Sequence, residues 1–235
     1  MPNDFFRFRQ FTVWQDRCAL KVGTDGVLLG AWTVHAGALR ILDIGTGTGL
    51  LALIAAQRNA DAVVDAVELD PAAAAQAREN AAASPWPARI RVHQADIRHW
   101  AAPARYDLIV CNPPFYKGHG TPYDRRMATA KHEGALDLEG VMRSLAEHGT
   151  AAVRASMILP FHRHGELLAI AAMHGFSPLR ECAVRYMAGK PPKRMLVELA
   201  RGVHAPVRSE LAVHDGPGTF TAGYRRLVGD LEEDF

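Results

Sequence analysis

The chain has 235 residues, of which 49% are hydrophobic and 22% are charged, so it can bury the core of a globular α/β domain. Its formal net charge of +2 is too small to require a nucleic-acid partner, although local basic clusters remain compatible with one. The three cysteines are widely spaced and form no CxxC pair, which excludes a disulfide framework and a cysteine zinc site and favours a reducing cytoplasm.

Neither a membrane segment nor a metal site is predicted. The N-terminal stretch MPNDFFRFRQF lacks the apolar region of a signal peptide, and no apolar run reaches membrane-spanning length. His162 and His164 lie close together, but no carboxylate or cysteine at ligand spacing joins them, so we interpret them as surface residues. We therefore expect a cytoplasmic protein without a metal ion.

Residues 5 to 22 alternate aromatic and basic side chains, a pattern that predicts short strands or a hairpin. One interpretation is a strand pair that covers an edge of the core. The other is a flap that faces RNA or covers a cofactor. The pattern alone leaves both open.

The segment that begins at Lys21 predicts a helix through Trp32, capped by Thr24 or Asp25. Glycine is unfavourable in a helix start, so its repeated use here indicates close approach of the backbone to another group. The exposed N–H groups of such a helix start would also suit a carboxylate. The glycines concerned are Gly23, Gly26 and Gly30.

Residues 40 to 49, RILDIGTGTG, combine a short strand, an acidic residue and alternating glycines ahead of an apolar helix. The spacing is GxGxG rather than GxGxxG, and the carboxylate of Asp43 would repel a dinucleotide pyrophosphate. An α-amino group beside a sulfonium would be attracted to it instead. The turn therefore favours S-adenosylmethionine (AdoMet) over NAD.

Two further carboxylates follow the next two predicted strands. The strand at residues 63 to 69 carries Glu68 near its end, about twenty residues beyond the glycine turn, where such folds hold a ribose diol. The strand at residues 89 to 93 ends near Asp96, whose carboxylate suits an adenine amino group. Solvated loop charge is the alternative for both, but their distance from the glycine turn favours cofactor roles.

Residues 106 to 115, YDLIVCNPPF, predict a buried strand that delivers a loop with few hydrogen-bond donors. Pro113 and Pro114 have no backbone N–H, so the loop offers carbonyls, one side-chain amide and one aromatic ring. Asn112 Oδ1 and the Pro113 carbonyl can accept two N–H bonds from a planar amino-bearing substrate while Phe115 stacks on its ring. Taken alone, the motif is equally compatible with an ordinary proline turn.

The remaining sequence predicts further elements of an α/β fold, with strands at 150–159, 177–186 and 195–199 and helices at 71–83, 138–147 and 163–174. Residues 116 to 132 are polar and basic and predict a mobile loop that clamps the substrate. The basic turn at residues 190 to 194 is either solvated surface or a phosphate contact. We expect residues 203 to 235 to form a loosely packed tail with one helix around 224–231.

The ordered set of glycine turn, two acids and NPPF resembles class I AdoMet-dependent methyltransferases that act on amino or amide nitrogen. Longer stretches are similar to the tRNA (adenine-N6) methyltransferase family that modifies adenine 37 of valine tRNA. The resemblance is strong through Asp107 and thinner from Tyr116. Phe115 stands where adenine enzymes often have tyrosine, and guanine-N2 rRNA methyltransferases also have phenylalanine there. The similar stretches are FRFRQFTVWQDRCALKVGTDGVLLGAW, LDIGTGTGLLAL, DAVELD, SPWPARIRVHQADI and HEGALDLEG.

The resemblance implies a Rossmann-like α/β fold: a seven-stranded, mostly parallel sheet with the last strand antiparallel and helices on both faces. We expect one methyltransferase domain over residues 1–235. Its parts would be an N-terminal hairpin and capping helix at 1–35, the Rossmann-like core at 36–202 and a C-terminal tail at 203–235. The implied activity is AdoMet-dependent methylation of adenine N6 in a tRNA anticodon loop. Nothing in the sequence suggests an obligate dimer, so we expect a monomer.

Alternative functions within the same fold are guanine-N2 rRNA methylation and glutamine-N5 protein methylation. A non-catalytic AdoMet- or RNA-binding module has no use for two bare carbonyl acceptors, and an NAD oxidoreductase is disfavoured by Asp43. The residues expected to act on the substrate are Asn112, Pro113, Pro114 and Phe115. Those expected to bind the cofactor are Lys21, Gly23, Thr24, Asp25, Asp43, Gly45, Thr46, Gly47, Gly49, Glu68, Leu69, Asp96, Ile97 and Asn112.

Overall fold

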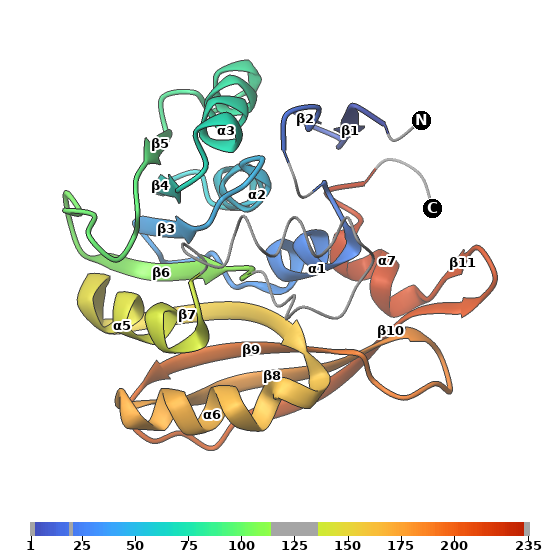
Figure 1. Ribbon diagram of the computed structural model, residues 1–235. Coiled ribbons are helices and arrows are strands. Elements are labelled where there is room, and N and C mark those ends of the chain that lie inside the picture. The colour runs from blue at the N-terminus through green and yellow to red at the C-terminus, as the bar shows by residue number, and fades with distance from the viewer. Residues whose placement is uncertain (1–2, 19–20, 114–135, 233–235) are drawn as a thin grey trace, which may run out of the picture.

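A computed structural model describes residues 3–18, 21–113 and 136–232 of the chain. Its centre is a nine-stranded sheet with helices on both faces (Figure 1). The strands are β3 (Arg40–Ile44), β4 (Val63–Glu68), β5 (Ile90–Gln94), β6 (Tyr106–Cys111), β7 (Gly149–Pro160), β8 (Phe176–Met187), β9 (Arg194–Arg201), β10 (Val207–Gly216) and β11 (Thr219–Phe220). The helices are α1 (Thr24–Trp32), α2 (Leu50–Arg58), α3 (Pro71–Ala83), α5 (Leu138–His148), α6 (His164–Met173) and α7 (Ala222–Val228), with a 3₁₀ turn η1 (Phe161–Arg163).

A separate antiparallel hairpin, β1 (Phe5–Arg7) and β2 (Thr12–Trp14), precedes the sheet. Phe8 and Phe11 of the turn and Val13 of β2 are buried in the core, while the cross-strand partners Phe5 and Trp14 are exposed and their rings are in contact. The hairpin therefore covers part of the core and presents an aromatic pair to solvent.

The predicted α/β fold is confirmed, and the seven expected strands are β3 to β9 in the order β8-β9-β7-β6-β3-β4-β5. The last of them along the chain, β9, runs antiparallel to both of its neighbours. The sheet is wider than predicted because β10 pairs in parallel with β8, and β11 pairs with β10.

The expectation of a loosely packed tail is wrong for residues 207 to 220, which form β10 and β11, whereas the one helix expected around 224–231 is present as α7. The outer strand β10 buries Val213 alone, so its sequence is as polar as that of a loop. Tyr224 and Val228 of α7 are buried against the core, and the backbone of Leu231 accepts a hydrogen bond from the amide of Arg9. The C-terminal segment thus packs against the N-terminal one.

Two hydrophobic clusters fill the two sides of the sheet. Helices α1, α2 and α7 pack on one face, and α5 and α6 pack on the other (Figure 1). Helix α1 lies unusually close to α2, because a Cβ atom on Gly26 would lie 2.9 Å from Leu50 and one on Gly30 would lie 2.6 Å from Ile54. The close approach predicted from these glycines is therefore a contact with α2. Within the described residues, no helix is long and apolar enough to cross a membrane.

The site is positioned by the strand order. Strands β3 and β6 are neighbours, yet the chain passes from β3 to β4 and β5 on one side before returning to β6 on the other. A reversal of this kind opens a crevice beyond the carboxyl ends of the strands, which is where open α/β sheets bind ligands.

Candidate functional site

Four loops converge at the carboxyl edge of the parallel strands. They follow Ile44 of β3, Glu68 of β4, Gln94 of β5 and Cys111 of β6. These strands are adjacent in the sheet, so the loops after them lie side by side. Every polar residue predicted from the Rossmann-like core lies in one of these loops or in the strand directly before it.

The glycine turn after β3 is held by the neighbouring strand and remains open on its outer side. The amides of Gly45 and Thr46 donate to the carbonyl of Val67 at 2.9 and 3.1 Å. Gly45 and Gly47 have φ angles of +69° and +56°, a region that favours glycine. A Cβ atom at either position would meet nothing within 4 Å, so there is room for a ligand against the backbone.

Asp43 lies beneath this turn and is fully buried. Its Oδ2 accepts a hydrogen bond from the Thr46 hydroxyl, whereas Oδ1 has no hydrogen-bond partner among the described residues. Burial raises the pKa of Asp43 to about 7, against the opposing effects of the Thr46 hydroxyl and the nearby backbone amide of Ala52. A buried carboxylate with one unsatisfied oxygen is suited to a cationic ligand, which would supply the missing partner.

Glu68 links the end of β4 to the glycine turn. Its Oε2 accepts the Gly47 amide at 2.8 Å and its Oε1 accepts the Asp70 amide at 2.9 Å. Each carboxylate oxygen keeps a second lone pair, so Glu68 can still accept hydrogen bonds from two hydroxyl groups. Leu69 follows directly and is 47% exposed, which adds an apolar surface beside these acceptors.

Asp96 is already engaged by a residue that the sequence analysis did not identify. Arg98 donates from Nε to both carboxylate oxygens and from its backbone amide to Oδ1. These bonds hold the pKa of Asp96 below its ordinary value. An amino group bound at Asp96 would therefore share the carboxylate with Arg98. Ile97, between them, is buried.

The segment that begins at Lys21 is anchored at both ends. Lys21 Nζ donates to the carbonyl of Asn3 at 2.9 Å, and Gly23 is the N-cap residue of α1. The Asp25 carboxylate accepts a hydrogen bond from the Tyr186 hydroxyl and another from Arg194 Nε at 2.7 Å. Asp25 thus connects α1 to the end of β8 and the start of β9. This contact could not be predicted from the sequence, because the residues are far apart along the chain.

Asn112 and Pro113 leave β6 at the switch point next to Asp43. Asn112 is partly exposed, and its side chain makes no hydrogen bond with another residue of the described chain. Pro113 is buried. Pro114 and Phe115 lie outside the described residues, as does the loop 116 to 132 that is predicted to clamp the substrate. Two of the four predicted substrate-contacting residues are therefore placed at the crevice.

Two buried amides of α3 attach the N-terminal segment to this site. Asn80 accepts the Trp14 amide and donates to the carbonyls of Trp14 and Thr48, each at 2.8 or 2.9 Å. Gln76 accepts the Arg17 amide at 3.1 Å. The sequence offered no signal for either contact, because a polar residue in an alanine-rich helix is usually exposed.

The sequence matches the family described as "Methyltransferase small domain" over residues 22–158. It is 44% identical over 231 residues to the tRNA1(Val) (adenine(37)-N6)-methyltransferase of Aeromonas hydrophila, with 96% of each chain covered. It is 48% identical to the protein of the same description from Tolumonas auensis, with 98% of each chain covered. The protein so described from Bacteroides thetaiotaomicron is 40% identical, with 97% of each chain covered.

Solved structures share the fold at lower identity. A predicted O-methyltransferase from Agrobacterium tumefaciens superposes with a TM-score of 0.68 at 24% identity, covering 88% of this chain and 96% of its own. A ribosomal protein L11 methylase from Lactobacillus delbrueckii superposes with a TM-score of 0.55 at 18% identity, covering 76% of this chain and 78% of its own. These likenesses concern the fold alone.

Proposed function

Because the chain belongs to the family of tRNA1(Val) (adenine(37)-N6)-methyltransferases, we propose that it transfers a methyl group from AdoMet to N6 of adenine 37 in the anticodon loop of valine tRNA. One observation supports this activity above the others. The side chain of Asn112, which makes no hydrogen bond with another described residue, follows β6 where that strand pairs with β3. Strand β3 carries the buried carboxylate of Asp43, whose Oδ1 has no hydrogen-bond partner among the described residues. An acceptor for an amino group thus adjoins an acceptor for a cationic cofactor.

The residues at the crevice fit AdoMet. The unsatisfied Oδ1 of Asp43 would accept the α-amino group of the methionine part, which would pass over the open side of the glycine turn. Glu68 would accept the ribose hydroxyls, and the exposed side chain of Leu69 would flank the adenine ring. AdoMet would supply an electrophilic methyl group on its sulfonium. The remaining cofactor-binding residues in this proposal are Lys21, Gly23, Thr24, Asp25, Gly45, Thr46, Gly47, Gly49, Asp96, Ile97 and Asn112.

In this proposal Asp25 acts on the cofactor indirectly. Its carboxylate is held by Tyr186 and Arg194, so it fixes the start of α1 while the backbone of the preceding residues covers the methionine end. Lys21 would cover the same end, with its ammonium group anchored on Asn3.

Asn112 and Pro113 would activate the substrate nitrogen. The N6 lone pair of adenine is delocalised into the ring, so the free amine is a poor nucleophile. Accepting both N–H bonds at Asn112 Oδ1 and the Pro113 carbonyl favours a pyramidal nitrogen whose lone pair points at the methyl group. The nitrogen gains positive charge as the bond forms, so these acceptors bind the transition state more tightly than the ground state.

No general base is needed before the transfer, because the methylated nitrogen is acidic and loses its proton afterwards. Phe115, as predicted from the sequence, would stack on the base, and this stacking would stabilise the bound base by about 1–3 kcal/mol. That stabilisation offsets part of the few kcal/mol that unstacking a base requires, a cost that is smaller in a loop than in a duplex.

The proposal is tested by incubating the protein with methyl-labelled AdoMet and either total tRNA or rRNA, followed by digestion to nucleosides. We expect N6-methyladenosine from tRNA, and loss of the label when a valine tRNA transcript carries guanine in place of adenine 37. N2-methylguanosine, or label in protein, would instead identify one of the two alternative activities.

A further inference from the structure

A basic and aromatic surface lies beside Asn112 at the ends of β7, β8 and β9. It consists of Phe161, Lys190 and Lys193, which we call the basic edge. Phe161 is 39% exposed although it is a large apolar residue, and both lysines are exposed. The mechanism above uses none of these residues.

The strand register fixes how far the basic edge lies from Asn112. Strand β6 pairs with β7 through Cys111 and Met157, and β7 pairs with β9 through Pro160 and Arg194. Phe161 is therefore one strand away from Asn112 and about three residues further along, a separation of about 11 Å. Lys193 lies one more strand away, at about 14 Å. Nucleotides on either side of a base held at Asn112 fall within reach of Phe161 and Lys193, and Lys190 precedes Lys193 by three residues in the same turn.

The backbone of the basic edge is well fixed. The Phe161 amide donates to the Lys193 carbonyl at 3.0 Å, and the Lys193 amide donates to the Val184 carbonyl at 2.8 Å. Arg185 donates to the Lys190 carbonyl at 2.9 Å. Pro191 and Pro192, between the lysines, further restrict the turn.

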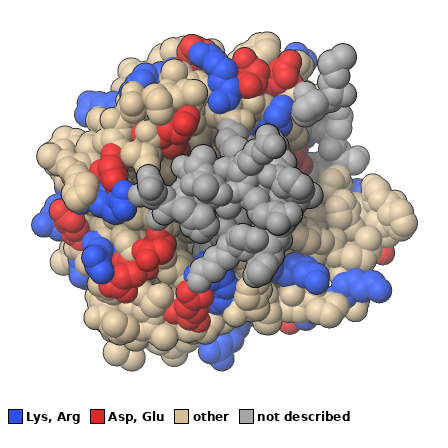
Figure 2. Space-filling model, in the orientation of Figure 1, with Lys and Arg blue, Asp and Glu red and all other residues tan. Residues whose placement is uncertain are grey.

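The charge of the two lysines is not used within the described chain. Of the neighbouring carboxylates, those of Asp25 and Glu210 are each bound by an arginine, Arg194 and Arg185 respectively. Asp215 follows His214, the residue of β10 that pairs with Met187, and forms no ion pair with either lysine within the described chain. Lys190 and Lys193 form no ion pair with any residue that the structure describes. Figure 2 shows basic side chains over the loop that joins β8 and β9.

We infer that the basic edge binds the anticodon arm next to the target base, with Lys190 and Lys193 on backbone phosphates and Phe161 stacked on a flanking base. Lysines that form no ion pair with the described residues, on a fixed turn, match a phosphate backbone, and an exposed ring beside them matches an unstacked base of a single-stranded loop. A protein substrate has neither a phosphate backbone nor a nucleobase to fill these positions. This inference rests on the proposed function, because it assumes that the base held at Asn112 belongs to RNA.

The lysines are tested with the double variant Lys190→Ala/Lys193→Ala. We expect its affinity for valine tRNA to fall about tenfold at moderate salt, and the slope of log affinity against log salt to decrease by about 1.4. Calorimetric affinity for AdoMet and the melting temperature should stay at the wild-type values. The matched control is Arg40→Ala/Arg91→Ala, which removes two exposed charges at the opposite edge of the sheet. Equal tRNA affinity and salt slope in the two double variants would overturn the phosphate contacts.

Phe161 is tested with a pair of substitutions that separates stacking from packing. Phe161→Leu keeps an apolar side chain but loses the aromatic face, and kcat/KM for tRNA should fall at least about fivefold. Phe161→Tyr keeps the face and should retain nearly full kcat/KM. If both variants, or neither, lose activity, the ring does not stack on a base.

The two proposals fail in different ways. A wild-type protein that makes no N6-methyladenosine in tRNA overturns the proposed function. A wild-type protein that makes it, with both lysine and phenylalanine variants equal to their controls, overturns the basic edge alone.

Discussion

Asn112 carries the proposed chemistry most directly, because its amide oxygen is one of two acceptors for the reacting amino group. Asn112→Ala removes that acceptor, and we expect methyl transfer to tRNA to fall about 100-fold or more. Affinity for AdoMet should fall far less than the rate of transfer, because Asn112 is one of several proposed cofactor contacts and Asp43 and Glu68 remain. Label incorporation into tRNA and calorimetric titration with AdoMet measure the two effects separately. Near-normal turnover in this variant would contradict the mechanism.

The buried carboxyl group of Asp43 should destabilise the cofactor-free protein to an extent that depends on pH. Its pKa rises from 3.8 to about 7 on folding because the carboxyl group is buried. Between these values the folded state binds more protons than the unfolded state, so the free energy of unfolding decreases as pH rises from about 4 to 7. Asp43→Asn removes this destabilisation. Relative to the wild type, we expect the free energy of unfolding of the variant to be higher by about 2–4 kcal/mol at about pH 8 and unchanged at about pH 4, as measured by urea unfolding.

The same substitution should lower affinity for AdoMet at least about tenfold at neutral pH, because a neutral amide replaces the charged partner of the α-amino group. The amide oxygen of the substituted side chain can still accept a hydrogen bond from the Thr46 hydroxyl, so the variant keeps this local contact and changes mainly the charge. A variant that binds AdoMet as tightly as the wild type would contradict the assigned role of Asp43, whatever its stability.

At the scale of elements, helix α3 joins the N-terminal hairpin to the glycine turn through Asn80. This amide is completely buried and makes three hydrogen bonds, to both backbone groups of Trp14 and to the Thr48 carbonyl. Asn80→Ala leaves those groups without a partner, so we expect a loss of about 2–4 kcal/mol in the free energy of unfolding. Hydrogen exchange should also show the hairpin amides losing protection before the sheet does.

The neighbouring residue on α3 provides the control. Glu79 forms an exposed ion pair with Arg17, and its side chain is 58% exposed. Glu79→Ala should cost at most about 1 kcal/mol, because solvent screens such pairs. Equal losses in the two variants would show that the hairpin is not held by the buried amide.

Elements with strong periodicity or clear caps were predictable from the sequence. Helix α3 begins at Pro71 after an aspartate cap and ends at Ala83, as predicted, and the glycine turn, Glu68 and Asn112 all lie at one edge of the sheet. These features follow from local rules of capping and strand–turn–helix geometry. Strand β10 was missed because an outer strand buries too few residues to show an apolar pattern.

The contacts that support the site were not predictable for a different reason. Asp25 meets Tyr186 and Arg194 across separations of 161 and 169 residues, and pairing at such distances leaves no trace in a single sequence. Asp96 and Arg98 are only two residues apart. An acidic and a basic residue at this spacing in a loop can either form an ion pair or be solvated separately, and the sequence alone does not tell which. The sequence therefore predicts which groups face the ligands, a prediction that the proposed experiments test, and the structure adds the groups that hold those side chains in place.

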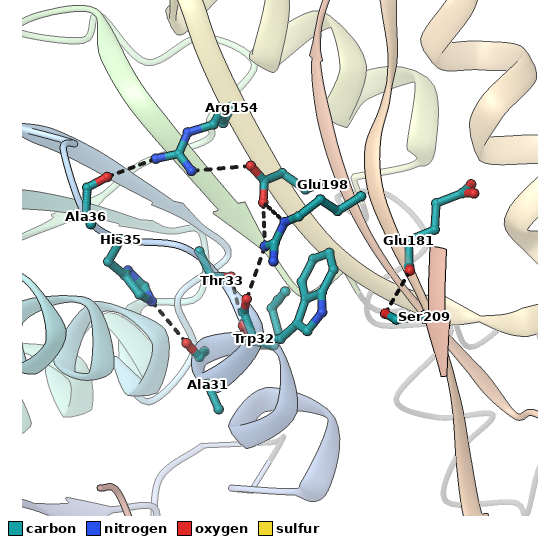
Figure 3. A network of polar contacts seen from close by, with 12 residues as sticks. Ala31, Trp32, Thr33, His35, Ala36, Arg154, Glu181, Glu198 and Ser209 are labelled. Carbon is teal, nitrogen blue, oxygen red and sulfur yellow. Dashed lines mark hydrogen bonds and ion pairs between the residues drawn. The ribbon is translucent and has the colours of Figure 1, made fainter. Parts of the chain in front are cut away.

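At the scale of the whole molecule, a buried charge network joins the antiparallel part of the sheet to the first helix. Glu198 of β9 is 1% exposed and accepts hydrogen bonds from Arg154 of β7 and Arg180 of β8. Arg154 also donates to the carbonyl of Ala36 (Figure 3). Arg180 donates to the carbonyl of Trp32, over whose ring it stacks at 4.2 Å. One carboxylate thus fixes three strands and the chain that leaves α1.

Because this network spans segments that are far apart in sequence, its loss should reduce the stability of the whole fold. Glu198→Ala leaves two partly buried guanidinium groups without their carboxylate, and we expect the free energy of unfolding to fall by about 3–5 kcal/mol. Thermal denaturation should then show a melting temperature lower by roughly 6–20 °C. Glu210→Ala is the matched control, since it removes a carboxylate that is 66% exposed and pairs with Arg185 on the same part of the sheet. Similar melting temperatures for the two variants would show that Glu198 contributes no more than a surface ion pair.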